Sequence, residues 1–331
     1  METSENLETQ NLESMNWGLD KKIPNHIEGH QCINTARTTE DIHHQVNDGH
    51  DVFYSLDGKR LINATGHLTR YTVTHGTQVI CHGAFCETYA TEIILPDTIL
   101  AIGFNPFGRT HLKKLVLPKN VCHIETVNPF ASCFTLEELI VLSPYFVVEQ
   151  GVLYTSDYKI CYGAVTKDYP KDLTIHKGTE IIANSAFFRR QLNSVYIPDS
   201  VREIGYAAFA YTDLKEVRLP HSIDEIPEAC FQCCSLTSVV IPEYVNNIGE
   251  DAFSNNEKLE SISMLGMVES MGYGTLSCCP HLFKITGPSG SKILNLKTVL
   301  KAGLGDRKDL HSRRESCTVN GRRVITMYLT K

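Results

Sequence analysis

The sequence has no long apolar run, no excess of positive charge and none of the short motifs that mark common enzyme sites. Its apolar stretches fall far short of the ~18 residues that a transmembrane helix needs, so no membrane span is expected. A net charge of −7 excludes the overall basic character that is typical of nucleic-acid-binding proteins. No G-x-S-x-G, H-E-x-x-H, P-loop or G-x-G-x-x-G stands in a suitable context, so we expect neither an enzyme nor a cofactor.

The amino-terminal stretch lacks the basic start and the apolar centre of a secretory signal. It reads METSENLETQNLESMNWGLDKK and holds the only tryptophan, Trp17. We therefore expect a cytoplasmic protein. The 12 cysteines are spread through a chain of 331 residues, which favours reduced thiols over the disulfide framework of a small secreted domain.

What the chain does have is a repeat with a period of 22 residues. An isoleucine column is followed five residues later by a phenylalanine column and further along by a proline column. Units of this kind bury their apolar side chains only when they are stacked, so the period predicts a solenoid. The columns are Ile80, Ile102, Ile124, Ile182, Ile204, Ile226 and Ile248; Phe85, Phe107, Phe187, Phe209, Phe231 and Phe253; and Pro96, Pro118, Pro198, Pro220 and Pro242.

Each column has an expected structural role. Segments of the form L-x-x-V-x-[LI]-P alternate apolar and polar residues as a short strand does, and the proline ends the strand by removing a hydrogen-bond donor. The Ile-Gly pair, as in Ile204-Gly205, puts a core side chain beside a residue that is able to adopt positive φ. The following Ala-Phe pair is expected to place an aromatic ring between neighbouring coils.

A longer repeat is superimposed on the short one. The segments YSLDGKRLI at 54–62 and YTSDYKICY at 154–162 align at an offset of 100, and Asp57-Gly58 is a typical hairpin turn. We therefore divide the repeat region 50–286 into two hairpin-led blocks, 50–144 and 145–286. A polar segment at 1–49, expected to be a partly disordered region or a cap, precedes them, and a basic segment at 287–331 follows.

These residues carry a family resemblance. The pattern I-G-x-x-A-F-x-x-C-x-x-L-x-x-V-x-I-P, interrupted by hairpins of the V-L-Y-T-x-D type, resembles the BspA-like leucine-rich repeat family over about residues 50–286. The resemblance implies a β-rich, right-handed leucine-rich-repeat solenoid with one short parallel strand per coil and inserted β-hairpins. Many members are surface or secreted binding proteins, which adds a cell-surface or secreted location, reached by an unconventional route, as the alternative to the cytoplasm. No catalytic residues come with the resemblance.

The carboxy-terminal segment 287–331 is predicted to be a small α/β cap. The stretch SKILNLKTVLKAGLG indicates a short helix ended by glycine, and CTVNGRRVITMYL indicates a hairpin around Asn320-Gly321. The alternative is that its basic residues contact phosphates or an acidic protein. Nucleic acid is the less favoured partner, because the segment has few aromatic residues to stack on bases. The basic residues in question are Arg313, Arg314, Arg322 and Arg323.

A C-x-x-C-C string at Cys230, Cys233 and Cys234 raises the question of a metal or redox site. Cys230 stands where other coils have alanine, and Cys234 shares a position with Cys133, Asn256 and Cys279, so only Cys233 is unexplained by the repeat. A second pair, Cys278-Cys279, would lie about 10 Å away across two coils, too far to share a zinc ion. Packed thiols are therefore favoured, and no metal site is expected.

The histidines of the amino-terminal part could also bind metal, but they lack the i, i+4 spacing of a helical zinc site. We expect them to be solvated and incidental. They are His43, His44, His50, His67, His75 and His82.

The remaining candidate site is the face of the strands that points away from the core. Its central row is mostly apolar or aromatic, and contiguous exposed apolar surface often marks an interaction site. The alternatives are that β-branched residues simply favour strands, or that the amino-terminal segment covers them. We favour a binding face for an unidentified protein. The proposed contacts are Ile94, Val116, Ile140, Tyr196, Arg218 and Val240.

Overall fold

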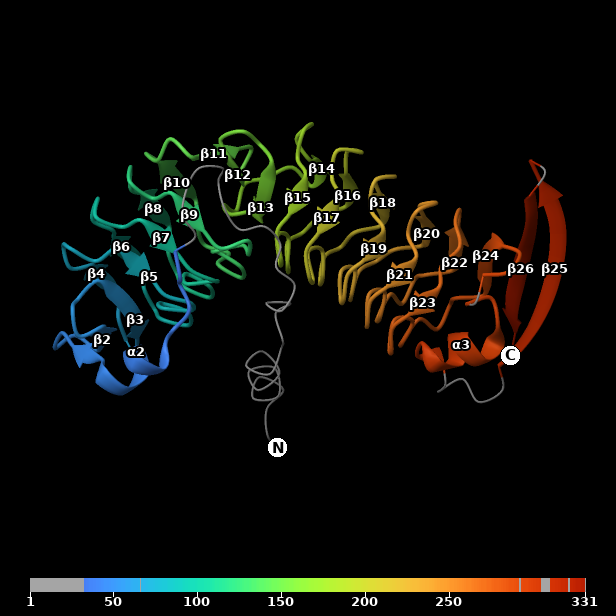
Figure 1. Ribbon diagram of the computed structural model, residues 1–331, viewed down its shortest axis with the longest axis horizontal. Coiled ribbons are helices and arrows are strands. Elements are labelled where there is room, and N and C mark those ends of the chain that lie inside the picture. The colour runs from blue at the N-terminus through green and yellow to red at the C-terminus, as the bar shows by residue number, and fades with distance from the viewer. Residues whose placement is uncertain (1–32, 66, 292, 305–309, 321, 331) are drawn as a thin grey trace.

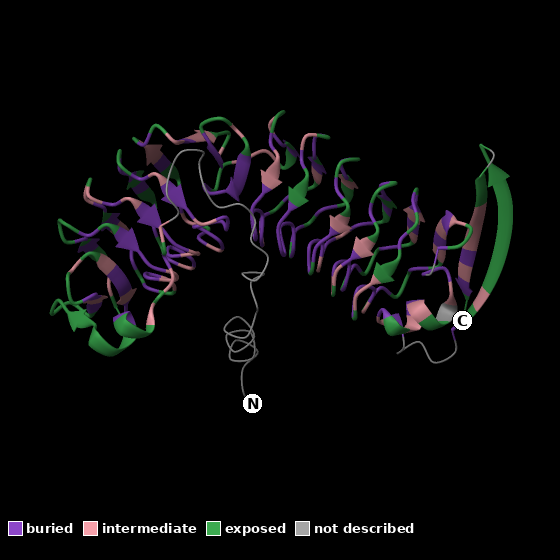
Figure 2. Ribbon diagram, in the orientation of Figure 1, coloured by how far each residue is buried: buried purple, intermediate pink, exposed green. Residues whose placement is uncertain are grey.

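The computed structural model is an arch of stacked coils (Figure 1) and describes residues 33–65, 67–291, 293–304, 310–320 and 322–330. The longer strands lie on the outer side of the arch, and tight turns that carry the phenylalanine column lie on its inner side. Buried residues line the inside of the coil stack, whereas exposed residues gather at its margins and on the last hairpin (Figure 2). Within the described residues, no helix has the length and apolar character needed to cross a membrane.

The outer strands form three sheets. The first is parallel and contains β4 (Arg70–Thr72), β6 (Glu92–Ile94), β8 (Lys114–Leu117) and β10 (Glu138–Val141). The second contains β14 (Asp172–Thr174), β16 (Ser194–Tyr196) and β18 (Glu216–Arg218). The third runs from β20 (Ser238–Ile241) through β22 (Ser261–Met264) and β24 (Lys284–Pro288) to the antiparallel pair β26 (Arg322–Thr330) and β25 (His311–Val319). The five strands that precede a proline of the column, β6, β8, β16, β18 and β20, end one or two residues before it, as predicted.

The coils also contain a second series of short strands, so the expectation of one strand per coil is incomplete. The isoleucine column stacks in register, so the backbones of adjacent coils pair there as well, for example Ile182 with Ile204. The paired segments are β5 (Val79–Ile80), β7 (Ala101–Ile102), β9 (His123–Ile124), β15 (Ile181–Ile182), β17 (Glu203–Ile204), β19 (Glu225–Ile226), β21 (Asn247–Ile248) and β23 (Ser270–Met271).

Both hairpins predicted from the longer repeat are confirmed. In the first, β1 (Val46–Asn47) and β2 (Val52–Tyr54) precede β3 (Arg60–Ala64); in the second, β11 (Phe146–Glu149) and β12 (Val152–Thr155) precede β13 (Ile160–Ala164). Asp57 closes the first turn, since its carboxylate accepts hydrogen bonds from the Ser55 hydroxyl and the Lys59 amide. The division of the chain into two blocks stays a prediction.

The phenylalanine column forms a stack of parallel rings through the core. Phe187, Phe209, Phe231 and Phe253 are fully buried, and the centroids of neighbouring rings are 5.3, 5.5 and 5.7 Å apart. Adjacent rings are tilted by less than 10°. One ring per coil therefore fills the space between coils, as the sequence predicted.

A polar position three residues after each phenylalanine completes the turn. The Cys234 thiol lies 3.3 Å from the Phe209 carbonyl oxygen, and the Asn256 amide donates to the Phe231 carbonyl at 2.8 Å. The Thr212 hydroxyl donates to the same Phe209 carbonyl at 2.9 Å. Buried carbonyls need such donors, which explains why cysteine, asparagine and threonine alternate at this position.

The glycine that follows the isoleucine is needed for close approach of the coils and not for the positive φ that it could adopt. Gly205 and Gly249 do not adopt positive φ; instead, a Cβ on either would lie 2.4 Å from a backbone nitrogen of the preceding coil. Glycine is needed there because neighbouring coils approach too closely for a side chain. Positive φ occurs at the two ends of the inner turn, for example at Ala229 and Cys233, so Cys233 occupies a turn position of the repeat where other coils have Tyr211 or Asn255.

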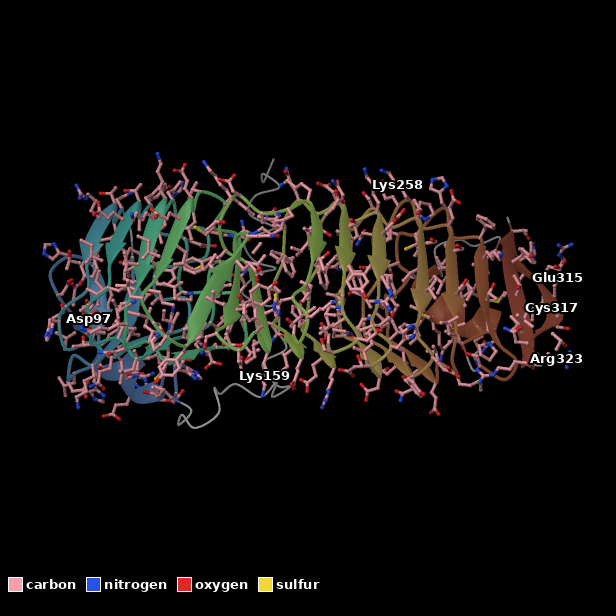
Figure 3. All side chains as sticks on the ribbon, turned by 90° about the horizontal axis from the view of Figure 1, so that it is seen from above. Asp97, Lys159, Lys258, Glu315, Cys317 and Arg323 are labelled. Atoms are coloured by element: carbon pink, nitrogen blue, oxygen red, sulfur yellow. The ribbon has the colours of Figure 1, made fainter. Side chains whose placement is uncertain are left out.

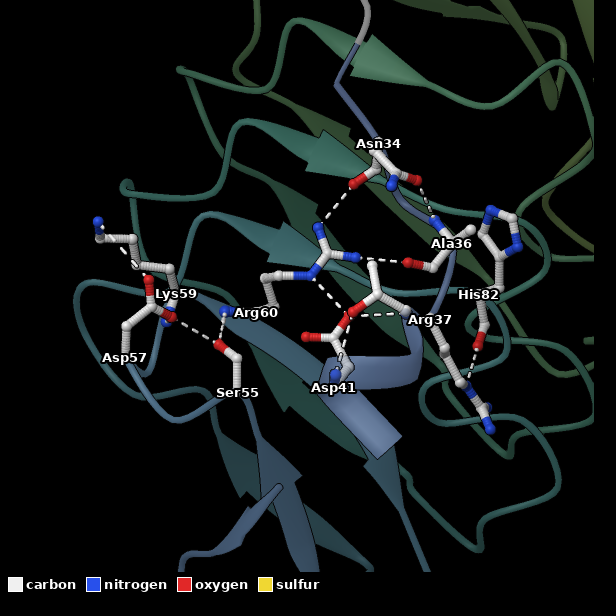
Figure 4. Close-up of polar contacts among 10 residues, drawn as sticks. Asn34, Ala36, Arg37, Asp41, Ser55, Asp57, Lys59, Arg60 and His82 are labelled. Atoms are coloured by element: carbon white, nitrogen blue, oxygen red, sulfur yellow. Dashed lines mark hydrogen bonds and ion pairs between the residues drawn. The ribbon is translucent and has the colours of Figure 1, made fainter. Parts of the chain in front are cut away.

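The described part of the amino-terminal segment is fastened to the first coils (Figure 4). Arg60 donates to the carbonyls of Asn34 and Ala36 and pairs with the buried Asp41 at 3.1 Å. Thr38 caps the short helix α2 (Thr39–His44) by a reciprocal hydrogen bond with Asp41. The part of this segment that contains Trp17, which we expected to be polar and partly disordered, lies outside the described residues.

The carboxy-terminal segment covers the end of the core, which confirms the predicted α/β cap. Helix α3 (Leu296–Lys301) ends just before Gly303, and the last two strands form the predicted hairpin, whose Gly321 lies outside the described residues. Leu310, Met327 and Leu329 are buried in the same core as the last coils.

Replacing Phe209 by alanine removes the middle ring of the stack and leaves a cavity, because the coils on either side cannot close up. We expect a loss of about 3 to 5 kcal/mol in the free energy of unfolding, measured by urea denaturation. The control is Tyr273→Ala, whose side chain is exposed and which should change stability by less than about 0.5 kcal/mol. Equal effects of the two substitutions would contradict a stacked core.

Candidate interaction surface

The structure places all six predicted strand-face residues on the outer face of the arch. Ile94, Val116, Tyr196 and Val240 are 51, 36, 43 and 51% exposed. Arg218 is exposed and Ile140 is half-buried. The outward orientation is therefore confirmed, whereas a binding role for these residues stays a prediction.

The strand register aligns these side chains across neighbouring coils. Val116 lies one coil after Ile94 and pairs with Ile140 of the following coil. Tyr196 pairs with Arg218. Val240 begins the third sheet, where it pairs with Ser263. Seen from above the arch, the strands run across its width, with Asp97 near one end and Glu315, Cys317 and Arg323 near the other (Figure 3). The six residues thus fall into two groups, one before and one after the second hairpin.

A row of alternating charges accompanies the first apolar group and was missed by the sequence analysis. Arg70 pairs with Glu92 at 2.6 Å and Lys114 pairs with Glu138 at 2.7 Å, two residues before the apolar row on the same strands. Its signal was present in the sequence, since the four charges follow one another at spacings of 22, 22 and 24 residues and alternate in sign. Such exposed pairs contribute little to stability but can orient a partner.

The second group is held in place by polar contacts. The guanidinium of Arg218 lies 4.8 Å from the centre of the Tyr196 ring and 3.2 Å from the Asp199 carboxylate. Burial slightly opposes ionisation of Asp199, but the His221 amide and Arg218 hold its pKa below the usual value. Tyr196 therefore presents a fixed ring beside a cation, a combination common at binding hot spots.

The described amino-terminal segment covers a different surface from the strand face. Ile33 packs against Val79 and Ala101 of the short-strand sheet. The Thr35 hydroxyl donates to the Glu125 carboxylate at 2.6 Å, and His82 and His123 face the same carboxylate at 3.8 and 3.7 Å. Burial raises the pKa of Glu125, but the nearby imidazoles of His123 and His82 and the hydrogen bond from Thr35 outweigh it and hold this pKa well below the usual range.

The four basic residues of the alternative patch do not form one surface. Strand register puts Arg313 and Arg322 on the outer face, whereas Arg314 and Arg323 lie on the opposite face of the hairpin. Arg313 pairs with Glu315 and Arg322 with Glu243, each at 2.7 Å. The alternative of a phosphate-binding segment is therefore not supported, because the charges are divided and two of them are neutralised.

All the described cysteines are free, and most are buried. Burial raises the pKa of the Cys234 thiol to about 12 and that of Cys279 to about 11, and it raises the pKa of Cys230 as well. These thiols are poor nucleophiles and poor metal ligands at neutral pH. In the part of the chain that the structure describes, no three histidine, cysteine or acidic side chains are grouped as metal ligands.

Of the six histidines considered in the sequence analysis, five are exposed as expected and His82 is the exception. His67 stacks on Tyr89 with ring centres 5.6 Å apart, and His111 stacks on the other face of Tyr89 at 5.7 Å. His82 is half-buried and lies 2.9 Å from the Thr35 hydroxyl, so the expectation that it is incidental is wrong. It helps to hold the amino-terminal segment, which lies far from it in the sequence.

Comparison with known proteins agrees with the fold. The sequence model of the BspA type leucine-rich repeat region matches residues 59–160 and 180–298 with 6 copies. A leucine-rich cell surface protein from Faecalibacterium prausnitzii A2-165 is 29% identical over 71% of this chain and 62% of its own, with a TM-score of 0.61. No curated protein matches the chain.

Two further solved structures share the fold. The pneumococcal vaccine antigen PcpA is 23% identical over 66% of this chain and 56% of its own, with a TM-score of 0.60. A leucine-rich repeat protein from Eubacterium ventriosum is 18% identical over 66% and 75%, with a TM-score of 0.50. This chain therefore spans only about three fifths of the F. prausnitzii and pneumococcal proteins.

Thiol labelling at pH 8 tests the account of the cysteines. We expect Cys278 and Cys317, which are exposed, to react with iodoacetamide at least tenfold faster than Cys230, Cys234 and Cys279. Peptide mapping by mass spectrometry gives the rate for each residue, and labelling of the unfolded chain in urea is the control. Fast labelling of Cys230 in the native protein would show that the thiols are not packed in the core.

Replacement of Glu125 by glutamine tests how the amino-terminal segment is held. Because the pKa of Glu125 is lowered, its stabilising effect is present above the ordinary carboxyl range and is lost as pH falls through the lowered pKa. We expect Glu125→Gln to speed amide exchange in residues 33–41 severalfold at pH 7, measured by hydrogen exchange and mass spectrometry. The exposed Glu138→Gln serves as the control, and unchanged exchange in both variants would contradict this anchoring.

Proposed function

The chain belongs to the BspA-type leucine-rich repeat family, and from that premise we propose that it is a non-enzymatic scaffold that binds another protein through its outer strand face. The observation that carries the proposal is the apolar row Ile94, Val116 and Ile140, which continues beyond the second hairpin at Tyr196, Arg218 and Val240. Within the first and the second outer sheet these side chains are in register, and all six point away from the core.

The rigidity of the coils supports a binding role. Each strand-face residue stands on a backbone that is hydrogen-bonded to neighbouring coils and sits above buried partners such as Leu115 and Val195. Side chains fixed in this way lose little conformational entropy when a partner docks. Apolar residues flanked by charge pairs also give the mixture of central apolar contact and polar rim that protein interfaces show.

The place where the protein acts decides which partners it meets. The F. prausnitzii relative is a cell surface protein, which supports an extracellular partner, and a cytoplasmic partner is the alternative. Protease treatment of intact cells followed by detection of the chain separates the two, since only a surface protein is digested.

Alanine at both Tyr196 and Val240 tests the proposal. A protein captured by the wild-type chain should bind the double variant at least tenfold more weakly, because two side chains that are exposed before binding would lose their buried contacts. Affinity is measured by calorimetry with the purified partner. Tyr244→Ala, which removes an exposed aromatic ring outside the row, should leave the affinity unchanged.

Equal affinity of the wild type and the double variant, with the Tyr244→Ala control also unchanged, would contradict the proposal. A circular dichroism melt of each variant confirms that the coils remain folded. Binding lost equally in all variants would point to a contact elsewhere on the chain.

A further inference from the structure

An open hollow lies between the second hairpin and the first strand of the second outer sheet. Its volume is about 320 Å³, within the range of ligand pockets. Its apolar walls come from Val152, Tyr154 and Leu173, which are buried residues of β12 and β14. Glu149 and Lys177 stand among the lining residues and are exposed.

The corresponding place beside the first hairpin is filled. Tyr71 of β4 occupies the position that Leu173 takes in β14, and its hydroxyl is hydrogen-bonded to Tyr54 at 2.6 Å and to Asp48 at 2.5 Å. By strand register, Asp48 corresponds to Glu149. The hollow therefore exists because leucine replaces a tyrosine whose phenol would reach this carboxylate.

The hollow adjoins an unpaired sheet edge. Strand β14 pairs with β16 on one side only. In a parallel sheet, successive residues direct their backbone groups to opposite sides, so when Ile175 donates to Tyr196 in β16, the amide and carbonyl of Thr174 point to the open side. Thr174 itself lines the hollow. An edge of this kind can accept one more strand.

We propose that this hollow and the edge of β14 bind an extended segment of a partner protein as an added strand. Backbone groups that alternate in direction along a strand are matched by another extended backbone, and side chains entering pockets then give specificity. One apolar side chain of the segment enters the hollow between Val152, Tyr154 and Leu173. The site adjoins the strand-face row, since Thr174 is the register partner of Tyr196, but it uses the backbone edge of β14 and the hollow instead of the outward side chains of that row.

The charged residues at the rim of the hollow determine which charges the bound segment should carry. Among the described residues neither Glu149 nor Lys177 is in an ion pair, so the site offers one free carboxylate and one free ammonium group. The bound segment therefore carries a basic and an acidic residue on either side of its apolar anchor. His176, another lining residue, stacks on Tyr158 with ring centres 3.7 Å apart, and its Nδ1 atom is buried without a hydrogen-bond partner among the described residues.

Selection from a displayed library of random ten-residue peptides on the full chain tests the proposal. We expect enriched peptides with an apolar residue between a basic and an acidic one. Leu173→Tyr should weaken their binding at least tenfold, because the phenol fills the hollow and reaches Glu149 as Tyr71 reaches Asp48. Methylation of a backbone nitrogen that pairs with Thr174 should weaken binding to a similar extent.

A second variant and two controls keep the outcome interpretable. If Leu173→Tyr lowers the melting temperature, Lys177→Glu decides, since it reverses a charge on the rim without changing the core. The double variant Tyr196→Ala, Val240→Ala should retain the peptide affinity, so this site and the strand face can fail separately. Hydrogen exchange at Thr174 should slow when the peptide is bound.

Three results would overturn the proposal. The first is a lack of enrichment over a library passed across bare support, and the second is peptide binding that survives both Leu173→Tyr and Lys177→Glu. The third is binding that tolerates every backbone methylation, which would assign the hollow to a compact ligand. Concentration-dependent dimers abolished by Leu173→Tyr would assign it instead to a second copy of this chain.

Discussion

The structure depends on the stacking of equivalent side chains from successive coils, at the distance that separates one coil from the next. Backbone pairing sets the distance between coils, and each column of the repeat has to meet that distance: aromatic rings lie flat on one another, glycines let backbones touch, and short polar groups reach the carbonyls of the turn before. Because each coil buries its neighbours, a solenoid gains stability from nearest-neighbour contacts along its length. Side chains that point outward from the coils are not constrained by this spacing.

We therefore expect functional residues where the repeat does not constrain the side chains, or where the repeat is interrupted. The outer row is free, since its side chains face away from the core. The period is broken at the second hairpin, where Arg190 takes the position of threonine and cysteine and donates to the carbonyls of Phe130 and Cys133, 3.3 Å away, across the junction. Burial lowers the pKa of this arginine, and among the described residues no carboxylate pairs with it, so it serves as a donor that joins the two runs of coils. Leu173, beside the same hairpin, opens the hollow.

The sequence predicted the features that repeat, since each column repeats the same physical requirement many times. The solenoid, the buried phenylalanines, the hairpins and the outward row all followed from spacing. It failed where three-dimensional proximity decides: the glycine after Ile204 is set by the backbone of the coil before it, and Thr35 and His82 meet Glu125 from distant parts of the chain. The hollow escaped notice because only alignment of Tyr71 with Leu173 shows that a filling group is missing.

The most direct measurement is hydrogen exchange of the full chain with and without a captured protein partner. The account predicts that binding slows exchange in the outer strands, at residues 92–94, 114–117, 194–196, 216–218 and 238–241, and leaves the inner turns unchanged. Protection confined to the inner turns at 206–211 and 228–233, with none in the outer strands, would contradict it and would move the binding surface to the opposite side of the arch.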